Sequence, residues 1–449
     1  MSRLLSRLNL SSSQIIIIGF ALLILCGAAL LMLPIATVSE ESACFLDALF
    51  TATSAVCVTG LVVHNTATYW TLFGQAVILV LIQIGGMGIV TVVVSISMAA
   101  GRRIGLMQRS TLQDALSAHH VGGIVKLTGF ILKVTFAVEM IGAMILGFHF
   151  QQDFGWLRGM WYGLFHSVSA FCNAGFDLLG EQIPYASLTG YAASPVVNIV
   201  VMLLIVIGGI GFLTWDDVRI NRYHIWQYRM QSKAILLSTV VLIVLPAAFF
   251  YFGELALPQW SHLTEAERFW GSLFQSVTPR TAGFNTLDIA SMSGVSQFLM
   301  LMLMLVGGAP GSTAGGMKTT TVVVLICSVI SVCRRKESIR CFNRRLDDDT
   351  VRHAAAILML YLTFFIAGGL CISWMENLPV MTCLFETASA IGTVGLTLCI
   401  TPGLGSGSRV ILILLMFFGR VGGLTLIFAT ASGKAAHAGM LPKEKIIVG

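Results

Sequence analysis

The sequence predicts an all-α membrane protein in which one unit occurs four times: a spanning segment, a short half-helix with a loop, and a second spanning segment. Only 11% of the 449 residues are charged and 56% are hydrophobic, whereas a soluble domain carries about 25% charged residues. Eight long apolar segments alternate in pairs with four shorter runs of similar sequence. Such self-similarity indicates an internal repeat.

The spanning segments are expected at residues 15–35, 69–98, 124–149, 194–214, 234–253, 296–332, 353–373 and 408–430. The first is interpreted as a retained span and not a signal peptide, because no small-residue cleavage pattern closes it. Within each pair, a run of about 12 residues is too short to cross the bilayer and predicts a re-entrant half-helix. The predicted repeats are 1–100, 101–217, 218–336 and 337–433, followed by a tail at 434–449.

Positive charge predicts the orientation of the chain. Most lysines and arginines lie near the N-terminus, in 101–133, 215–233 and 333–352, and in the tail, whereas acidic residues prevail in the opposite loops. The positive-inside rule therefore places both termini and the basic segments in the cytoplasm. We expect a multi-pass protein of the cytoplasmic (inner) membrane whose half-helices enter from outside, with the lipid bilayer and no nucleic acid as a partner.

Each half-helix is followed by a short stretch that ends in glycine and contains no Asp or Glu. We call these the filter stretches: Val58-Thr59-Gly60, Asn173-Ala174-Gly175, Thr281-Ala282-Gly283 and Thr393-Val394-Gly395. Non-helical backbone in a bilayer needs protein or a water-filled path around it. Four such loops around one axis would line a pore whose carbonyl oxygens replace the hydration shell of a cation. The half-helix C-terminal ends also favour a cation, and the lack of carboxylates indicates a monovalent one.

A second motif, rich in glycine and ending in threonine, lies in the second span of each repeat, at 85–91, 208–214, 307–313 and 419–425. For the first two copies, a packing face between helices is an equal alternative. In the third, the five glycines and Pro310 of 307–316 cannot hold a helix. We expect two half-helices there, joined by an intramembrane loop below the filter. One extra residue before Lys318 excludes a phosphate-binding loop.

Three cations in or near the spans are candidate functional residues. Arg420 stands where the other three copies have glycine, and a fixed charge inside a span indicates function. It is either a buried partner of Glu139 or of the 307–316 carbonyls, or an electrostatic barrier under the filter that also tethers that loop, which we favour. Lys318 either reaches the cytoplasmic vestibule or extends to the interface. Arg280 is expected to brace the third filter stretch.

Thr393-Val394-Gly395-Leu396 resembles the T-V-G-Y signature of potassium-channel filters, and the fourfold pattern resembles the Trk/Ktr/HKT superfamily of potassium transporters, the bacterial Ktr membrane subunit in particular. The resemblance implies K⁺ uptake, commonly stimulated by Na⁺. It implies a homodimer with one pore per subunit on a cytosolic ring of nucleotide-binding, RCK-type regulatory subunits. It also implies an intramembrane gate, here matched by Gly307, Gly308, Ala309, Pro310, Gly311, Ser312, Thr313, Ala314, Gly315, Gly316, Lys318 and Arg420.

Two alternatives remain open. One is a sodium-permeable member of the same superfamily: in plant relatives a serine in place of the first filter glycine accompanies sodium preference, so Gly60 favours potassium. The other is a membrane-embedded enzyme or a scaffold. An enzyme would need clustered nucleophiles, bases or metal ligands, and the spans hold only scattered ionisable residues. A scaffold has no need of four filter glycines.

Overall fold

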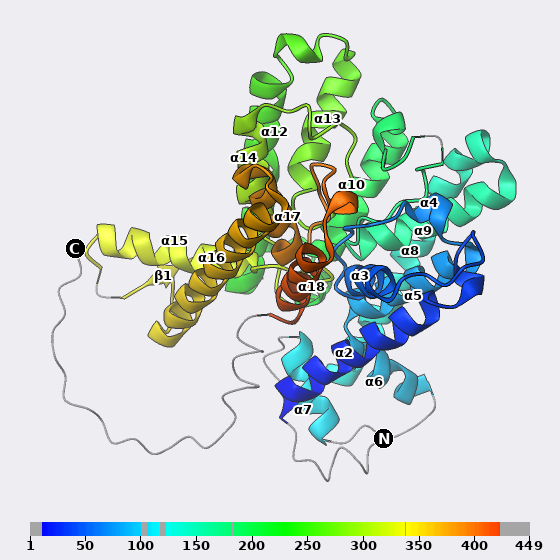
Figure 1. Cartoon of the computed structure of the whole chain (residues 1–449). Coiled ribbons are helices and arrows are strands. Elements are labelled where there is room, and N and C mark those ends of the chain that lie inside the picture. Colours follow the sequence, from blue (N-terminus) through cyan, green and yellow to red (C-terminus); the bar gives the residue numbers. More distant parts are fainter. Residues whose placement is uncertain (1–10, 100–105, 117–122, 182, 337, 423–449) are drawn as a thin grey trace.

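The computed structural model describes residues 11–99, 106–116, 123–181, 183–336 and 338–422, and it is almost entirely helical (Figure 1). The order of long helix, short helix and third helix occurs four times. These helices are α2 (Ser12–Leu31), α3 (Phe45–Val56) and α5 (Leu72–Met87); α8 (Ile124–Phe154), α9 (Trp156–Phe171) and α10 (Pro195–Gly209); α12 (Met230–Phe249), α13 (Glu265–Val277) and α14 (Gly294–Leu305); and α16 (Asp348–Glu376), α17 (Val380–Gly392) and α18 (Ser406–Val421).

The remaining elements connect or extend these helices. They are α4 (Thr66–Tyr69), α6 (Ile89–Ala99), α7 (Leu106–Leu116), α11 (Phe212–Asn221), α15 (Thr319–Cys333) and a hairpin of β1 (Arg340–Cys341) and β2 (Arg344–Arg345). The hairpin is a small exception among the described residues, whose other regular elements are all helices, as the predicted fold class expects. Its two turn residues, Phe342 and Asn343, both have positive φ (44° and 61°), as the common two-residue hairpin turn requires.

Two predicted spans, 69–98 and 194–214, are bent. The axis turns by 95° between α5 and α6 and by 94° between α10 and α11. Gly88 (φ 82°, ψ 134°) and Gly211 (φ 89°, ψ 141°) stand at the two bends, in a conformation that glycine adopts without steric cost. Among the described residues, four helices are long and apolar enough to cross a membrane, or six if each bent pair is one span.

The first glycines of the second motif pack closely in the first repeat, as the packing alternative for the first two copies predicted, and also in the fourth repeat, to which that alternative did not extend. A β-carbon on Gly85 would overlap the Val56 carbonyl, and one on Gly419 would overlap the Ile391 carbonyl. Both carbonyls lie in the last turn of a short helix, α3 or α17. Glycine therefore lets the third helix of a repeat rest directly on the end of its short helix.

The predicted break in the sixth segment is confirmed, because residues 306–318 between α14 and α15 are not helical. The two ends of this break lie together, since Val306 pairs with Met317. The last predicted span begins with α18, and its residues 423–430 lie outside the described residues, as does the tail 434–449.

The four repeats form a closed ring. The third helix of each repeat packs against the short helix of the next: α5 against α9, α10 against α13, α14 against α17, and α18 against α3. Figure 1 shows α17 and α18 (orange to red) lying between the green helices α12–α14 and the blue helix α3. The last repeat thus meets the first, and the ends of the short helices converge inside the ring.

Candidate ion pathway

The four filter glycines meet around one point inside the ring. All have positive φ, between 69° and 93°, which residues with a β-carbon rarely adopt. A β-carbon added to any of them would collide with the backbone of a neighbouring filter stretch. The collisions are Gly60 with the Ala174 oxygen, Gly175 with the Gly283 Cα (2.8 Å), Gly283 with the Val394 oxygen (2.6 Å) and Gly395 with the Thr59 oxygen. The sequence-predicted filter stretches are therefore neighbours in cyclic order.

The first residue of every filter stretch is also left-handed. The φ angles are 57° at Val58, 59° at Asn173, 66° at Thr281 and 51° at Thr393. A non-glycine residue with positive φ is uncommon and persists only where the surrounding structure enforces it. In every filter stretch, left-handed first and third residues thus flank a middle residue with negative φ.

Hydroxyl groups at the ends of the short helices hold the filter stretches, and the sequence analysis did not identify them. Ser54 Oγ accepts a hydrogen bond from the Gly60 N–H and Ser389 Oγ accepts one from the Gly395 N–H, both at 3.0 Å. In the other two repeats, Ser169 and Thr278 donate to the carbonyl that follows the filter glycine. The signal was a hydroxyl residue six positions before the filter glycine, or five in the third repeat.

Three threonine hydroxyls of the filter stretches have no hydrogen-bond partner in the described part of the chain. They are buried Oγ1 atoms of Thr59, Thr281 and Thr393. A buried polar group without a partner is destabilising unless something else satisfies it. No Asp or Glu belongs to the filter stretches, so the site offers uncharged oxygen atoms only.

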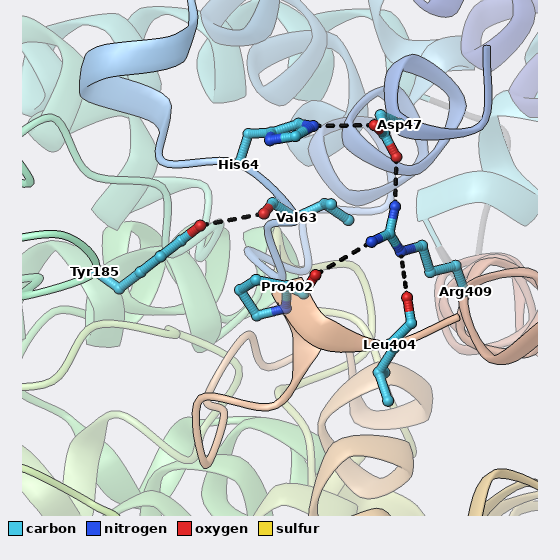
Figure 2. A network of polar contacts seen from close by, with 7 residues as sticks. All are labelled: Asp47, Val63, His64, Tyr185, Pro402, Leu404 and Arg409. Carbon is cyan, nitrogen blue, oxygen red and sulfur yellow. Dashed lines mark hydrogen bonds and ion pairs between the residues drawn. The ribbon is translucent and has the colours of Figure 1, made fainter. Parts of the chain in front are cut away.

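A polar network joins the first and fourth repeats (Figure 2). Arg409 of α18 donates to Asp47 of α3 at 2.6 Å, and Asp47 also pairs with His64 at 3.0 Å. The other guanidinium nitrogens of Arg409 donate to the carbonyls of Leu404 and Pro402 at 2.8 and 3.1 Å. Arg409 and Asp47 are largely buried, with side chains 18% and 14% exposed, so this ion pair closes the ring beside the first and fourth filter stretches.

The 307–316 segment lies directly under the filter. Gly315 packs against the Thr393 side chain, and the Thr313 hydroxyl lies 3.0 Å from Asn173 Oδ1. Thr393 and Asn173 are the first residues of their filter stretches, so the segment touches the inner end of the filter. Most of the segment is buried, as the expected loop below the filter requires.

The backbone of this segment is bonded to the second motifs of other repeats. The Ala309 N–H donates to the Gly209 carbonyl at 2.9 Å, and the Phe212 N–H donates to the Gly311 carbonyl at 2.7 Å. The Gly316 N–H donates to the Gly419 carbonyl at 3.2 Å. A helix would pair these backbone N–H and C=O groups within itself. Because the segment is not helical, the second motifs of the second and fourth repeats supply the hydrogen-bond partners instead.

Arg420 tethers the segment to the first repeat. Its guanidinium donates to the Thr313 carbonyl and, in the second motif of the first repeat, to the carbonyls of Gly85 and Gly86. Of the two partners considered for Arg420, the described structure supports the loop carbonyls and not Glu139. The carboxylate of Glu139 instead accepts from Gln83 at 3.1 Å.

Lys318 and Arg280 also bond to their surroundings. Lys318 Nζ donates to the Ala314 carbonyl at 2.8 Å. This bond stabilises the C-terminal end of the 307–316 segment. Arg280 is buried and donates to Thr239 Oγ1 of α12 at 3.0 Å. Its own carbonyl accepts from Asn173 Nδ2 at 3.3 Å, an arrangement in keeping with the expected bracing of the third filter stretch.

Comparison with known proteins gives consistent matches along nearly the whole chain. A family model, TrkH, described as "Cation transport protein", matches residues 10–437. The chain is 39% identical over 425 residues to the Ktr system potassium uptake protein B of Bacillus subtilis, with 94% of each chain covered. It is 39% identical over 455 residues to the potassium/sodium uptake protein NtpJ of Enterococcus hirae, covering 99% of this chain and 98% of that protein.

A solved structure has the same fold. The crystal structure of the potassium transporter TrkH from Vibrio parahaemolyticus aligns with a TM-score of 0.74 at 19% identity, over 94% of this chain and 85% of that one. The matched family comprises membrane cation transporters and not enzymes. Because its model covers most of the sequence, this chain belongs to the TrkH family of cation transport proteins.

Proposed function

We propose that this chain takes up K⁺ across the cytoplasmic membrane through a pore lined by the four filter stretches. The observation that carries the proposal is the meeting of the four filter glycines beside three buried threonine hydroxyls without partners. Carbonyl and hydroxyl oxygens can replace the hydration shell of an ion, and an uncharged set of ligands suits a monovalent cation. The names of the relatives from Bacillus subtilis and Enterococcus hirae support potassium as that ion.

In this proposal the chain crosses the membrane eight times, with both termini and the basic segments in the cytoplasm. The bends at Gly88 and Gly211 add a detail to that topology. The bends lie at the depth of the 307–316 segment, because the Phe212 N–H bonds to the Gly311 carbonyl and Arg420 joins Gly85 and Gly86 to Thr313. From there α6 and α11 run at about a right angle to α5 and α10.

The 307–316 segment is proposed to be the gate of this pore. It lies against the inner end of the filter and is tethered by Arg420, whose charge also opposes the passage of cations. The segment buries little apolar area, because most of its residues are glycine, alanine, serine or threonine. Its closed and open positions can therefore differ by only a few kcal/mol, as bistable elements require.

Potassium uptake by cells tests the proposed function. In a bacterial strain without its own K⁺ uptake systems, expression of this chain with its regulatory partner should restore growth at low K⁺. We expect added Na⁺ to raise the rate of K⁺ uptake. The second candidate is a carrier of both ions, which the name of the Enterococcus hirae relative favours; it predicts comparable ²²Na⁺ uptake. Absence of both fluxes from cells whose membranes contain the protein would reject the pore.

We further propose that two copies of the chain form a homodimer on a cytosolic, RCK-type regulatory ring. The candidate contact is 216–233 or 333–352, because most of the cations of both segments are exposed on the proposed cytoplasmic side. The purified protein should run as a dimer and bind the ring, and glutamine at Arg334 and Arg335 should weaken binding. A strictly monomeric particle whose flux is indifferent to the ring would contradict this proposal.

A further inference from the structure

The loop between α11 and α12, residues 222–229, exposes three large apolar side chains. Tyr223, Ile225 and Trp226 are 94%, 62% and 93% exposed. In a spanning helix such exposure is ordinary, because lipid covers the side chain. This loop, which contains a single 3₁₀ turn (Ile225–Gln227), lies outside the spanning helices, and an apolar cluster exposed there marks an interaction surface.

Hydrogen bonds at both ends fix the conformation of the loop, so its tip is exposed in the folded structure. The buried Tyr228 donates its hydroxyl hydrogen to the Arg222 carbonyl. Asp217 of α11 accepts from the Arg229 N–H at 2.8 Å and from Asn221 Nδ2 at 2.7 Å. These bonds close the loop at its base and leave the aromatic tip outside.

Cations surround the apolar tip. Arg222 and Arg229 are exposed, and Lys233 follows in the first turn of α12. Of the two acids at the middle of α11, Asp217 is buried and bonded within the loop base and Asp216 is half-buried, so positive charge prevails around the tip. An apolar centre with a positive rim is complementary to a surface with negative headgroups and an apolar interior.

The position of the loop along α12 fits such a surface. The helix begins at Met230, and its row of exposed apolar residues begins at Leu237. At 1.5 Å per residue, this start lies roughly 10 Å from Met230. The loop is therefore at the depth of the headgroups, where tryptophan and tyrosine are enriched in membrane proteins.

From this geometry we propose that the 222–229 loop docks on the anionic lipid headgroups of the cytoplasmic leaflet. Tyr223 and Trp226 enter the interface, and Arg222 and Arg229 bind the phosphate groups. Docking fixes the position of α11, whose Phe212 N–H bonds to the Gly311 carbonyl of the 307–316 segment. Flux then depends on anionic lipid, a consequence that rests on the proposed gate.

Lipid retention by the full-length protein tests the docking without reference to transport. The parent, an Arg222→Gln/Arg229→Gln variant and a Tyr223→Ala/Trp226→Ala variant are purified from vesicles of phosphatidylcholine and phosphatidylglycerol, and the retained phosphatidylglycerol is measured. Affinity should fall about fivefold for each arginine removed. Arg334→Gln/Arg335→Gln is the matched charge control, because it removes two exposed arginines, one with positive φ as at Arg222, from a segment without Trp or Tyr, and it should retain more phosphatidylglycerol than the arginine variant of the loop.

Flux measured in the same vesicles without the ring tests the coupling. Parent flux should rise when phosphatidylglycerol is added to phosphatidylcholine, and both loop variants should lose this response. If the loop variants lose lipid retention but their flux still rises with phosphatidylglycerol, the docking is supported and its coupling to the gate is rejected. If the loop variants retain lipid as the parent does but no longer bind the ring, the loop is a protein-docking surface and the lipid assignment is wrong. A parent without K⁺ flux rejects the pore and leaves the retention result standing.

Discussion

Serine in place of Gly60 or Gly395 should lower the apparent K⁺ affinity by about tenfold or more and reduce the preference for K⁺ over Na⁺. A β-carbon at either position meets a carbonyl oxygen of the neighbouring filter stretch, at φ of 91° and 93°. Left-handed backbone alone costs a residue with a β-carbon about 1–2 kcal/mol, which is about tenfold in an equilibrium constant. Serine at Gly175 should have a smaller effect, because its nearest contact is 2.8 Å and its φ is 69°.

Gly403→Ser is the control for this series. Gly403 belongs to the loop after the fourth filter stretch, and a β-carbon there meets nothing within 4 Å. Concentration-dependent ⁸⁶Rb⁺ or K⁺ uptake, with Na⁺ as competitor, measures the affinity and the preference. All variants should reach the membrane in similar amounts. If the four filter variants keep the parent affinity, the four stretches are not the ion pathway.

Removing Arg420 or shortening the 307–316 segment should raise flux and lessen its dependence on the regulatory ring. The guanidinium of Arg420 donates to Thr313 and to two carbonyls of the first repeat. A hydrogen bond from a charged group contributes about 1.5–3 kcal/mol, so Arg420→Ala favours the open position by about tenfold or more. Deletion of 309–315 can still connect α14 to α15, because the Gly307 N–H already bonds to the Met317 carbonyl.

Arg420→Lys separates the two effects assigned to this residue. Lysine keeps the charge but has no planar fork of donors, so it cannot hold Thr313, Gly85 and Gly86 together in the same way. A barrier made by charge alone predicts parent flux for this variant, whereas a tether predicts flux between those of the parent and Arg420→Ala. The readout is K⁺ flux in proteoliposomes with and without the ring. Unchanged flux in the deletion variant, inserted normally, would make the segment a structural kink and not a gate.

Local sequence patterns predicted much of the fold and of the candidate site. The short amphipathic runs before Gly60 and Gly395 form helices of 12 and 13 residues. Their length alone predicted that these helices are too short to span a bilayer. The break at 307–316 was predictable for the same local reason: glycine and Pro310 cannot continue a helix. The filter glycines were found by repetition alone.

Features that depend on contacts between repeats were not predictable in this way. The bends at Gly88 and Gly211 arise in motifs that equally suit straight, closely packed helices, so composition could not separate the two. Ser54 and Ser389 were overlooked because a hydroxyl residue in a helix has several local uses. The loop carbonyl that Arg420 contacts was predicted from the break at 307–316, whereas its partners in the first repeat, the carbonyls of Gly85 and Gly86, carry no sequence signal.

The Asp47–Arg409 ion pair bears on how the protein is made. Its two members are 362 residues apart in the chain, and a chain is synthesised and inserted from its N-terminus. The contact between the first filter stretch and its neighbour in the fourth repeat therefore forms only when translation is nearly complete. A chain truncated before the fourth repeat lacks one wall of the proposed ion pathway, because Gly395 is a neighbour of the first filter stretch. Ring closure thus becomes the last step of biogenesis, and the proposed pathway is incomplete until the fourth repeat is in place.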